Sequence, residues 1–244
     1  MSLNTANTPD GRGVLIYNGE MILLYSKGVN ISFPSEKCGP MKKSCEGFLY
    51  LTSHRVIFIS GGNTDLKSFS MPFHCMNDVK LEQPVLGANY LRGHAVPQPG
   101  GNLSCDVTWK IHFNKGGCID FGRALLKAAD MAHSFRPYDA PPVYQPPQSD
   151  FYAPPPEYYM APNGYNGFQA PTHAFPDQPP QGSVFVYDQP PPYSGIGPTP
   201  ENGMTRRNVR EYAPIGGNHP TPSAPPSYEA SYNAPPLPSK PHVE

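Results

Sequence analysis

Residues 47–58 read GFLYLTSHRVIF, and this stretch decides the fold of the first half of the chain. Two short runs of aliphatic and aromatic residues, 47–51 and 56–59, enclose the polar sequence Thr52-Ser53-His54-Arg55. Runs of this length and composition favour β-strands, and a short polar connection between them is typical of strands that pair. We therefore expect two strands here, joined by a tight connection.

Further strands are predicted on both sides of this pair. Apolar and polar positions alternate through much of the first half of the chain, which is typical of half-buried strands. Val29, Ile31 and Phe33, for example, would share one face. The predicted strands are 21–33, 68–73, 79–82, 90–96 and 107–113. The turn sequence Asn114-Lys115-Gly116-Gly117 predicts a hairpin that returns through 118–121.

The spacing then changes to that of a helix. Apolar residues recur at helical intervals at Phe121, Leu125, Ala128, Ala129 and Ala132. The charged residues Arg123, Lys127 and Asp130 would face elsewhere, and the helix would run for about 12 residues and end before Pro137. Antiparallel strands followed by one closing helix predict a mainly β fold with one C-terminal helix, a small barrel or orthogonal sandwich.

Proline divides the chain into two parts. Only 7 of the 34 prolines precede residue 137, whereas residues 137–244 hold 27 prolines and 11 tyrosines in 108 positions. A segment with few aliphatic residues and constant proline interruption cannot bury enough apolar surface to offset the entropy of ordering. We therefore expect a flexible N-terminus at 1–13, a folded domain at 14–136 and a disordered tail at 137–244.

The tail repeats the sequence Pro-Pro-x-Tyr four times. Shuffling the tail would give roughly 0.7 copies, so chance does not account for all four. Such segments are preset toward the polyproline II helix, which WW and SH3 domains bind in aromatic-lined grooves, and the tyrosine adds a large amphipathic anchor. The predicted WW-binding residues are Pro141, Pro142, Tyr144, Pro155, Pro156, Tyr158, Pro190, Pro191, Tyr193, Pro225, Pro226 and Tyr228.

Two other short motifs lie near the end of the tail. Pro235, Pro238 and Lys240 fit a P-x-x-P-x-Lys ligand of SH3 domains, in which the lysine would pair with acids beside the groove. Pro222-Ser223-Ala224-Pro225 resembles the late-domain tetrapeptide that recruits the membrane-budding machinery. Because it shares Pro225 with the last Pro-Pro-x-Tyr copy, binding at the two would be competitive. Coincidence in a proline-rich segment is the open alternative for both motifs.

Net charge is divided unevenly along the chain. Residues 1–136 carry 14 Lys and Arg against 10 Asp and Glu, a balance of +4, and the rest carries 4 against 9, a balance of −5. Neither value indicates the clustered basic face that direct nucleic-acid binding needs. A loose basic cluster, a candidate contact for phosphoinositide headgroups, is formed by Lys37, Lys42, Lys43 and Arg55. Exposed lysines on a soluble barrel need no ligand, so both interpretations stay open.

The sequence predicts no enzyme, metal site or cofactor. None of the eight His lies at metal-ligand spacing with Cys or another His, and no nucleophile elbow or phosphate-binding glycine loop occurs. The five cysteines are odd in number and form no Cys-x-x-Cys pair, so we expect reduced thiols. Residues 1–13 lack an apolar signal core, and no apolar run approaches the roughly 18 residues of a membrane span. A cytoplasmic and nuclear location is therefore expected.

The stretch 47–58 resembles the signature of the GRAM domain, a pleckstrin-homology-like (PH-like) fold. Two further sequences, SFSMPF at 68–73 and EQPVLGANY at 82–90, narrow the resemblance to one family of proteins with this domain. Together with the Pro-Pro-x-Tyr tail, they are similar to the WW-domain-binding protein 2 family, which includes a sperm postacrosomal-sheath branch.

This resemblance implies seven strands and a C-terminal helix, and a non-enzymatic adaptor whose motifs recruit WW domains of transcriptional co-activators and ubiquitin ligases. In somatic members the family is linked to transcriptional co-activation. In the sperm branch it is linked to egg activation, with a location in the perinuclear theca or postacrosomal sheath. The alternative function is a membrane protein whose GRAM domain binds phosphoinositides and whose tail is a spacer.

Overall fold

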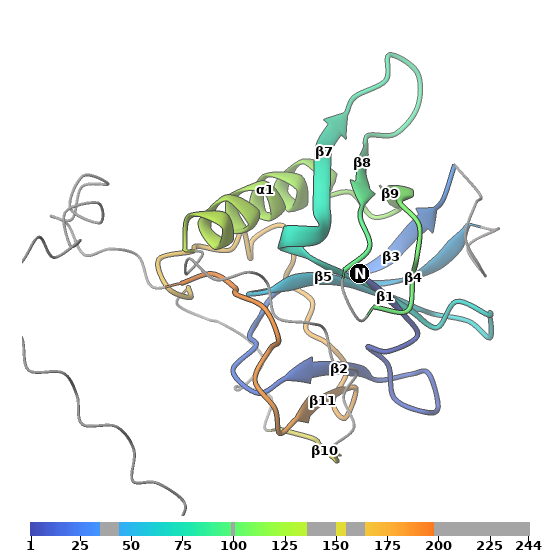
Figure 1. Cartoon of the computed structure of the whole chain (residues 1–244). Coiled ribbons are helices and arrows are strands. Elements are labelled where there is room, and N and C mark those ends of the chain that lie inside the picture. The colour runs from blue at the N-terminus through green and yellow to red at the C-terminus, as the bar shows by residue number, and fades with distance from the viewer. Residues whose placement is uncertain (35–43, 99–100, 136–149, 155–163, 198–244) are drawn as a thin grey trace, which may run out of the picture. The chain divides into compact units, whose positions relative to one another are not determined.

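The computed structural model describes residues 1–34, 44–98, 101–135, 150–154 and 164–197 (Figure 1). All of these residues belong to one folded unit within residues 1–199. A large antiparallel sheet, a smaller second sheet and one long helix make up this unit.

The main sheet has eight strands in the order β1-β6-β5-β4-β3-β9-β8-β7. Its strands are β1 (Ser2–Leu3), β3 (Ile22–Ser32), β4 (Cys45–Thr52), β5 (Arg55–Ser60), β6 (Ser68–Pro72), β7 (Met76–Glu82), β8 (Tyr90–Ala95) and β9 (Val107–Phe113). A short 3₁₀ helix, η1 (Phe73–Cys75), joins β6 to β7, and helix α1 (Cys118–Ser134) follows β9. The seven strands from β3 to β9 match the predicted strands, and with α1 they form the mainly β, PH-like fold that was expected.

The stretch 47–58 pairs β4 with β5, as predicted. Its run VIFI is apolar at every position because both faces of β5 are covered. Val56 and Phe58 lie in the main core, whereas Ile57 and Ile59 lie in a second apolar cluster on the opposite face. A strand that is buried on both faces shows a continuous apolar run instead of alternation.

A three-stranded sheet provides the cover on this second face. Its strands are β10 (Phe151–Tyr152), β11 (Val184–Tyr187) and β2 (Val14–Tyr17), in that order. β11 runs parallel to β2, and β10 is antiparallel to β11. Val14, Ile16, Val184 and Val186 are at most 1% exposed and belong to the same apolar cluster as the outer side chains of β5.

The structure thus differs from the expected disorder of the whole tail from residue 137. Residues 150–154 and 164–197 are placed on the domain, with β10 and β11 as part of the second sheet. The physical reason is the sequence VFVY at 184–187. It supplies a run of β-branched and aromatic side chains that covers sheet surface which would otherwise meet water.

The amino terminus also differs from the expected flexible segment at 1–13. Ser2 and Leu3 pair with Ser70 and Phe69 of β6, and Met1 is fully buried. Burial lowers the pKa of the terminal ammonium group, which donates to the thiol of a buried cysteine 3.4 Å away. A strand of two residues is too short to show any periodicity, so the sequence could not indicate it.

Helix α1 begins at Cys118, so the predicted return strand at 118–121 is wrong. Gly116 and Gly117 have φ of +79° and +84°, left-handed values that favour glycine, and they turn the chain from β9 directly into the helix. The predicted apolar face is buried, with Phe121 at 0% exposure, and packs against η1, β7 and β8. In the described part of the chain, no helix combines the length and apolar character needed to cross a membrane.

The cysteines are not all free thiols. Cys45, Cys75 and Cys118 are buried thiols that form no disulfide, and burial raises the pKa of Cys118 to about 11. Cys105 is disulfide-bonded, so the expectation of reduced thiols is wrong for this residue.

Candidate functional site

The structure bears on two of the predicted site elements, the third Pro-Pro-x-Tyr motif at 190–193 and Arg55. The other predicted site residues lie outside the described residues; they are Lys37, Lys42, Lys43, Pro141, Pro142, Tyr144, Pro155, Pro156, Tyr158, Pro222, Ser223, Ala224, Pro225, Pro226, Tyr228, Pro235, Pro238 and Lys240. The fold brings Arg55 and the third motif to the same end of the β4–β5 pair.

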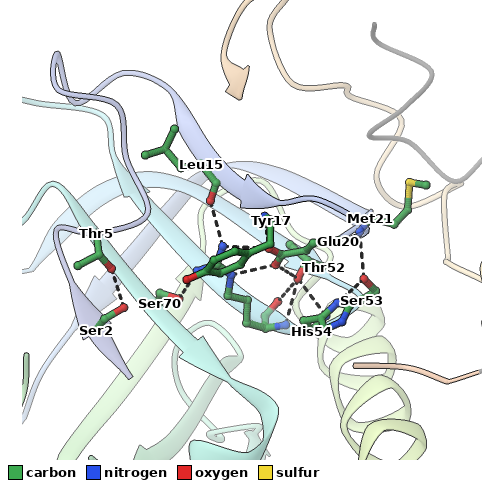
Figure 2. A network of polar contacts seen from close by, with 11 residues as sticks. Ser2, Thr5, Leu15, Tyr17, Glu20, Met21, Thr52, Ser53, His54 and Ser70 are labelled. Carbon is green, nitrogen blue, oxygen red and sulfur yellow. Dashed lines mark hydrogen bonds and ion pairs between the residues drawn. The ribbon is translucent and has the colours of Figure 1, made fainter. Parts of the chain in front are cut away.

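Arg55 points into the domain, and its side chain is only 2% exposed. Its guanidinium forms a two-pronged ion pair with Glu20, in which Nε donates to Oε1 and Nη2 to Oε2, both at 2.9 Å. Nη2 also donates to the carbonyl oxygen of Leu15 (3.0 Å) and Nη1 to Ser70 Oγ (3.1 Å), two partners drawn in Figure 2. The prediction that Arg55 contacts a lipid headgroup is therefore wrong, because the guanidinium faces acceptors inside the protein.

Glu20, in the turn after β2, is the centre of this polar network. Its carboxylate accepts from Thr52 Oγ1 at 2.6 Å and from the backbone N–H of Tyr17 at 2.9 Å (Figure 2). Burial alone would raise the pKa of this carboxyl, but the charge of Arg55 and these hydrogen bonds hold the pKa below its ordinary value. The ionised carboxylate thus ties β2 to the β4–β5 connection.

Ser53 and His54 form the tip of that connection. The backbone N–H of Ser53 donates to the carbonyl of Met21 (2.8 Å), and the N–H of Met21 donates to Ser53 Oγ (3.0 Å). Ser53 Oγ lies 2.8 Å from Nδ1 of His54. Burial lowers the pKa of His54; the Glu20 carboxylate opposes this shift and Arg55 adds to it. His54 is therefore a neutral imidazole at pH values near neutrality.

The tyrosine of the third motif packs on this network instead of projecting into water. Tyr193 is 7% exposed. Its ring meets Tyr17 edge-on at a centroid distance of 6.3 Å and lies 5.4 Å from His74 and 6.3 Å from His54. Tyr17 in turn carries the guanidinium of Arg55 over its ring, 4.7 Å from the centroid. We call the surface formed by Tyr17, His54 and His74 the Tyr193 pocket.

Backbone hydrogen bonds hold the chain on both sides of the motif. Before it, the N–H of Asn18 donates to the carbonyls of Tyr187 (2.9 Å) and Gln189 (3.0 Å). After it, the N–H of Ile196 donates to the carbonyl of Ser53 at 2.8 Å, and the Ile196 side chain is 3% exposed. The motif is therefore fastened at both ends as well as by its tyrosine.

Gly195 permits the closest part of this contact. A Cβ at this position would lie 2.5 Å from the carbonyl oxygen of Ser53 and 2.5 Å from Cδ2 of His54. A larger residue would therefore push the chain away from the β4–β5 connection. We call residues 184–197 the docked segment.

Sequence reasoning missed the partners of Arg55 and Tyr193. Glu20 lies 35 residues before Arg55 and meets it only through the fold, so no local spacing marks the pair. The sequence did contain an indication of the docked segment. The run at 184–187 combines β-branched and aromatic residues, which favour a strand, in a tail that otherwise has few aliphatic side chains and no regular apolar spacing.

Comparison with known proteins places the chain in a family. A model of the GRAM domain matches residues 32–131. WW domain-binding protein 2 of Homo sapiens is 40% identical over 134 residues, which are 54% of this chain and 51% of that protein. Postacrosomal sheath WW domain-binding protein of Macaca fascicularis is 40% identical over 147 residues, which are 59% of this chain and 56% of that protein. A stress-induced protein of Schizosaccharomyces pombe is 31% identical over 165 residues, which are 64% of this chain and 95% of that protein.

Among solved structures, the Vps36 N-terminal PH domain is similar with a TM-score of 0.43 and 18% identity, covering 55% of this chain and 96% of that domain. The chain spans about half the length of the WW domain-binding proteins that it matches. It spans nearly the whole of the yeast relative. The chain therefore contains a GRAM domain and belongs to the same family as the stress-induced protein of Schizosaccharomyces pombe, and it is similar to WW domain-binding protein 2 and the postacrosomal sheath WW domain-binding protein.

Proposed function

We propose that this protein is a non-enzymatic adaptor that recruits WW-domain proteins through its Pro-Pro-x-Tyr motifs. The observation that carries the proposal is the fourfold repeat of the motif between residues 141 and 228. Relatives that share the GRAM domain are named for binding WW domains, which supports it. A polyproline II segment loses little entropy when it docks, and the tyrosine ring fills a pocket on the partner.

The third motif is not equivalent to the others in this proposal. Its prolines are exposed or partly buried, but Tyr193 is held in the Tyr193 pocket at 7% exposure. A WW domain needs access to the tyrosine ring, so this motif is a ligand only when the docked segment leaves the domain. We therefore assign the first contacts to the motifs of Tyr144, Tyr158 and Tyr228.

The first two motifs flank a strand that is tied to the domain. Tyr144 lies seven residues before β10 and Tyr158 six residues after it, and β10 pairs with β11. Even a fully extended chain spans at most about 3.6 Å per residue, so each tyrosine stays within roughly 25 Å of the second sheet. Two motifs confined in this way would give a tandem WW protein a high effective concentration for its second contact.

Titration calorimetry of the full chain with a tandem WW-domain protein tests the proposal. The triple variant Tyr144→Ala/Tyr158→Ala/Tyr228→Ala should bind at least about 30-fold more weakly, because truncation of a tyrosine anchor typically costs 2 kcal/mol or more. Tyr193→Ala should leave the affinity within about twofold of the wild type, because a buried ring makes no contact with the partner.

Tyr152→Ala is the matched control, since Tyr152 is 46% exposed and stands outside every Pro-Pro-x-Tyr copy. Circular dichroism of each variant checks that the domain remains folded. A triple variant that binds as tightly as the wild type, or a control that loses as much as the triple variant, would show that the motifs are not the ligands.

The family resemblance extends the proposal to two biological settings. One is transcriptional co-activation in cytoplasm and nucleus, through WW domains of co-activators and ubiquitin ligases. The other is egg activation, from the postacrosomal sheath of sperm. Immunolocalisation in somatic cells and in sperm distinguishes the two, because the settings occupy different cells and compartments.

A further inference from the structure

His54 lies at the contact between the docked segment and the buried pair of Glu20 and Arg55. Figure 2 shows its ring beside Ser53, whose Oγ is 2.8 Å from Nδ1. From the other direction the docked segment comes so close that a Cβ on Gly195 would lie 2.5 Å from Cδ2 of the imidazole. The docked segment therefore encloses part of a ring that can take up a proton near neutral pH.

Four ionisable groups from four elements lie around His54. They are Glu20 in the turn after β2, Arg55 at the start of β5, His74 in η1 and Tyr193 in the docked segment. Burial is the main cause that lowers the pKa of His54; the Glu20 carboxylate raises it and the Arg55 guanidinium lowers it further. The carboxylate favours a proton on the imidazole only weakly, because it is already paired with Arg55.

The ring of Tyr193 does not offset the cost of a charged His54. An aromatic face stabilises a cation that lies within about 6 Å of the ring centroid. The imidazole of His54 is 6.3 Å from the centroid of Tyr193, whereas that of His74 is 5.4 Å from it. A proton on His74 would thus favour docking, and a proton on His54 would oppose it.

Protonation of His54 also changes the hydrogen bonding at the tip of the β4–β5 connection. An imidazolium has a hydrogen on both ring nitrogens, so Nδ1 can then only donate to Ser53 Oγ. That oxygen already accepts from the N–H of Met21 at 3.0 Å. The carbonyl of Ser53 accepts from the N–H of Ile196 in the docked segment at 2.8 Å. Ser53 therefore contacts both the titrating ring and the docked segment.

From this arrangement we propose that His54 is a proton-dependent switch, which holds the docked segment in place while neutral and releases it, with Tyr193, when protonated. Release exposes the imidazole to water, where it binds a proton with the ordinary pKa of 6.5. In the docked form the pKa is lower, so acid shifts the equilibrium toward release. The consequence of the switch rests on the proposed adaptor function, because acid would add the third motif to the available WW ligands.

The size of the effect follows from the same linkage. Above about pH 7 the imidazole is neutral in both forms, so docking does not depend on pH. Below about pH 6.5 the released chain binds a proton that the docked chain does not, and release becomes more favourable by up to about tenfold per pH unit. Carboxyl groups with ordinary pKa values near 4 remain ionised in this range. We therefore expect the opening constant to rise about three- to tenfold from pH 7.5 to pH 5.5.

Hydrogen exchange at the N–H of Ile196, followed by NMR in the full chain, tests the proposal. The exchange rate is divided by that of a free peptide of residues 186–197 at the same pH, which removes the intrinsic pH dependence and gives the opening constant. His54→Gln should abolish the rise between pH 7.5 and pH 5.5. His74→Gln is the matched control: it removes the other histidine that contacts Tyr193, and it should keep at least the acid response of the wild type.

The imidazole itself gives a second readout. In an NMR titration the pKa of His54 should be below 6.5 in the wild type. It should rise toward 6.5 in Gly195→Ala, where the added Cβ would displace the docked segment from the ring. Gly62→Ala, where a Cβ meets nothing within 4 Å, should leave the pKa unchanged. This comparison decides the question even if His54→Gln fails to fold.

Three results would overturn the proposal. One is an equal opening constant at both pH values in the wild type, and another is an undiminished acid response in His54→Gln. The third is a parallel loss of protection at the amides of β5, which would assign the response to unfolding of the whole domain. Because no WW protein is present in these experiments, their failure would leave the adaptor function standing. Failure of all WW binding would equally leave these measurements unchanged.

Discussion

Glu20 and Arg55 form a buried charge pair, so the loss of one partner should destabilise the domain. Arg55→Met should lower the free energy of unfolding by about 3–5 kcal/mol, because it leaves the Glu20 carboxylate buried without its counter-charge. Denaturant unfolding followed by the fluorescence of Trp109 measures the loss. The double variant Glu20→Leu/Arg55→Met should lose less than the sum of the two single variants, since it leaves no unpaired charge. A loss below about 1 kcal/mol for Arg55→Met would contradict the buried ion pair.

Acid should destabilise the domain in two steps. The pKa of His54 in the folded protein is below its ordinary 6.5, mainly through burial, so the unfolded chain binds this proton first as pH falls. The stability that neutral His54 contributes is therefore present above about pH 6.5 and is lost as pH falls toward the folded pKa. The pKa of Glu20 is held below 4.5 by Arg55 against the effect of burial, so its contribution is lost in the same direction at lower pH.

Urea unfolding at a series of pH values measures this dependence. His54→Gln should reduce the loss of unfolding free energy in the first step, below about pH 6.5. The reduction should be partial, because burial and the charge of Lys110 also lower the pKa of His112. His112→Gln is the companion variant that accounts for the remainder. A free energy of unfolding that stays constant between about pH 7 and pH 5 in the wild type would contradict the shifted histidines.

Individual elements differ in how far the sequence could predict them. The strands β3 to β9 could be predicted from apolar runs, alternation and turn residues. The reason is that the side chains each strand buries are encoded within the strand itself. The VIFI run of β5 held a further clue, since a strand with no polar face needs cover on both sides. The source of that cover, the sequence VFVY at 184–187, lies about 125 residues away and pairs in parallel with β2, which no local pattern encodes.

The misplaced start of α1 has a different cause. Asn114-Lys115-Gly116-Gly117 is a good hairpin turn by composition, but two consecutive glycines with positive φ also lead directly into a helix. Composition gives the same signal for both outcomes. The apolar face of the helix was nevertheless predicted correctly, because helical spacing fixes which side chains share a side. Arg55 could not be placed from the sequence at all. Its charge suggested a surface residue, and only the fold shows that Glu20 lies beside it.

On the scale of the whole molecule, the WW complex proposed for the third motif would compete with the packing of that motif on its own domain. When a ligand is available in only a fraction of the molecules, its apparent Kd equals its intrinsic Kd divided by that fraction. Docking buries Tyr193 and Ile196 and adds the hydrogen bond from Ile196 to Ser53. Each 1.4 kcal/mol of docking energy lowers the affinity of this motif tenfold.

The competition can be measured in a chain that keeps only the third motif, Tyr144→Ala/Tyr158→Ala/Tyr228→Ala. This chain should bind a single WW domain at least about tenfold more weakly than a free peptide of residues 186–197, because the peptide has no domain to leave. Adding Gly195→Ala should bring the affinity close to that of the peptide, since its Cβ would collide with Ser53 and His54 and release the segment. Gly62→Ala, where a Cβ meets nothing within 4 Å, should have no effect. Equal affinities of chain and peptide would mean that the docked segment does not restrict Tyr193, and the third motif would then be a ligand like the other three.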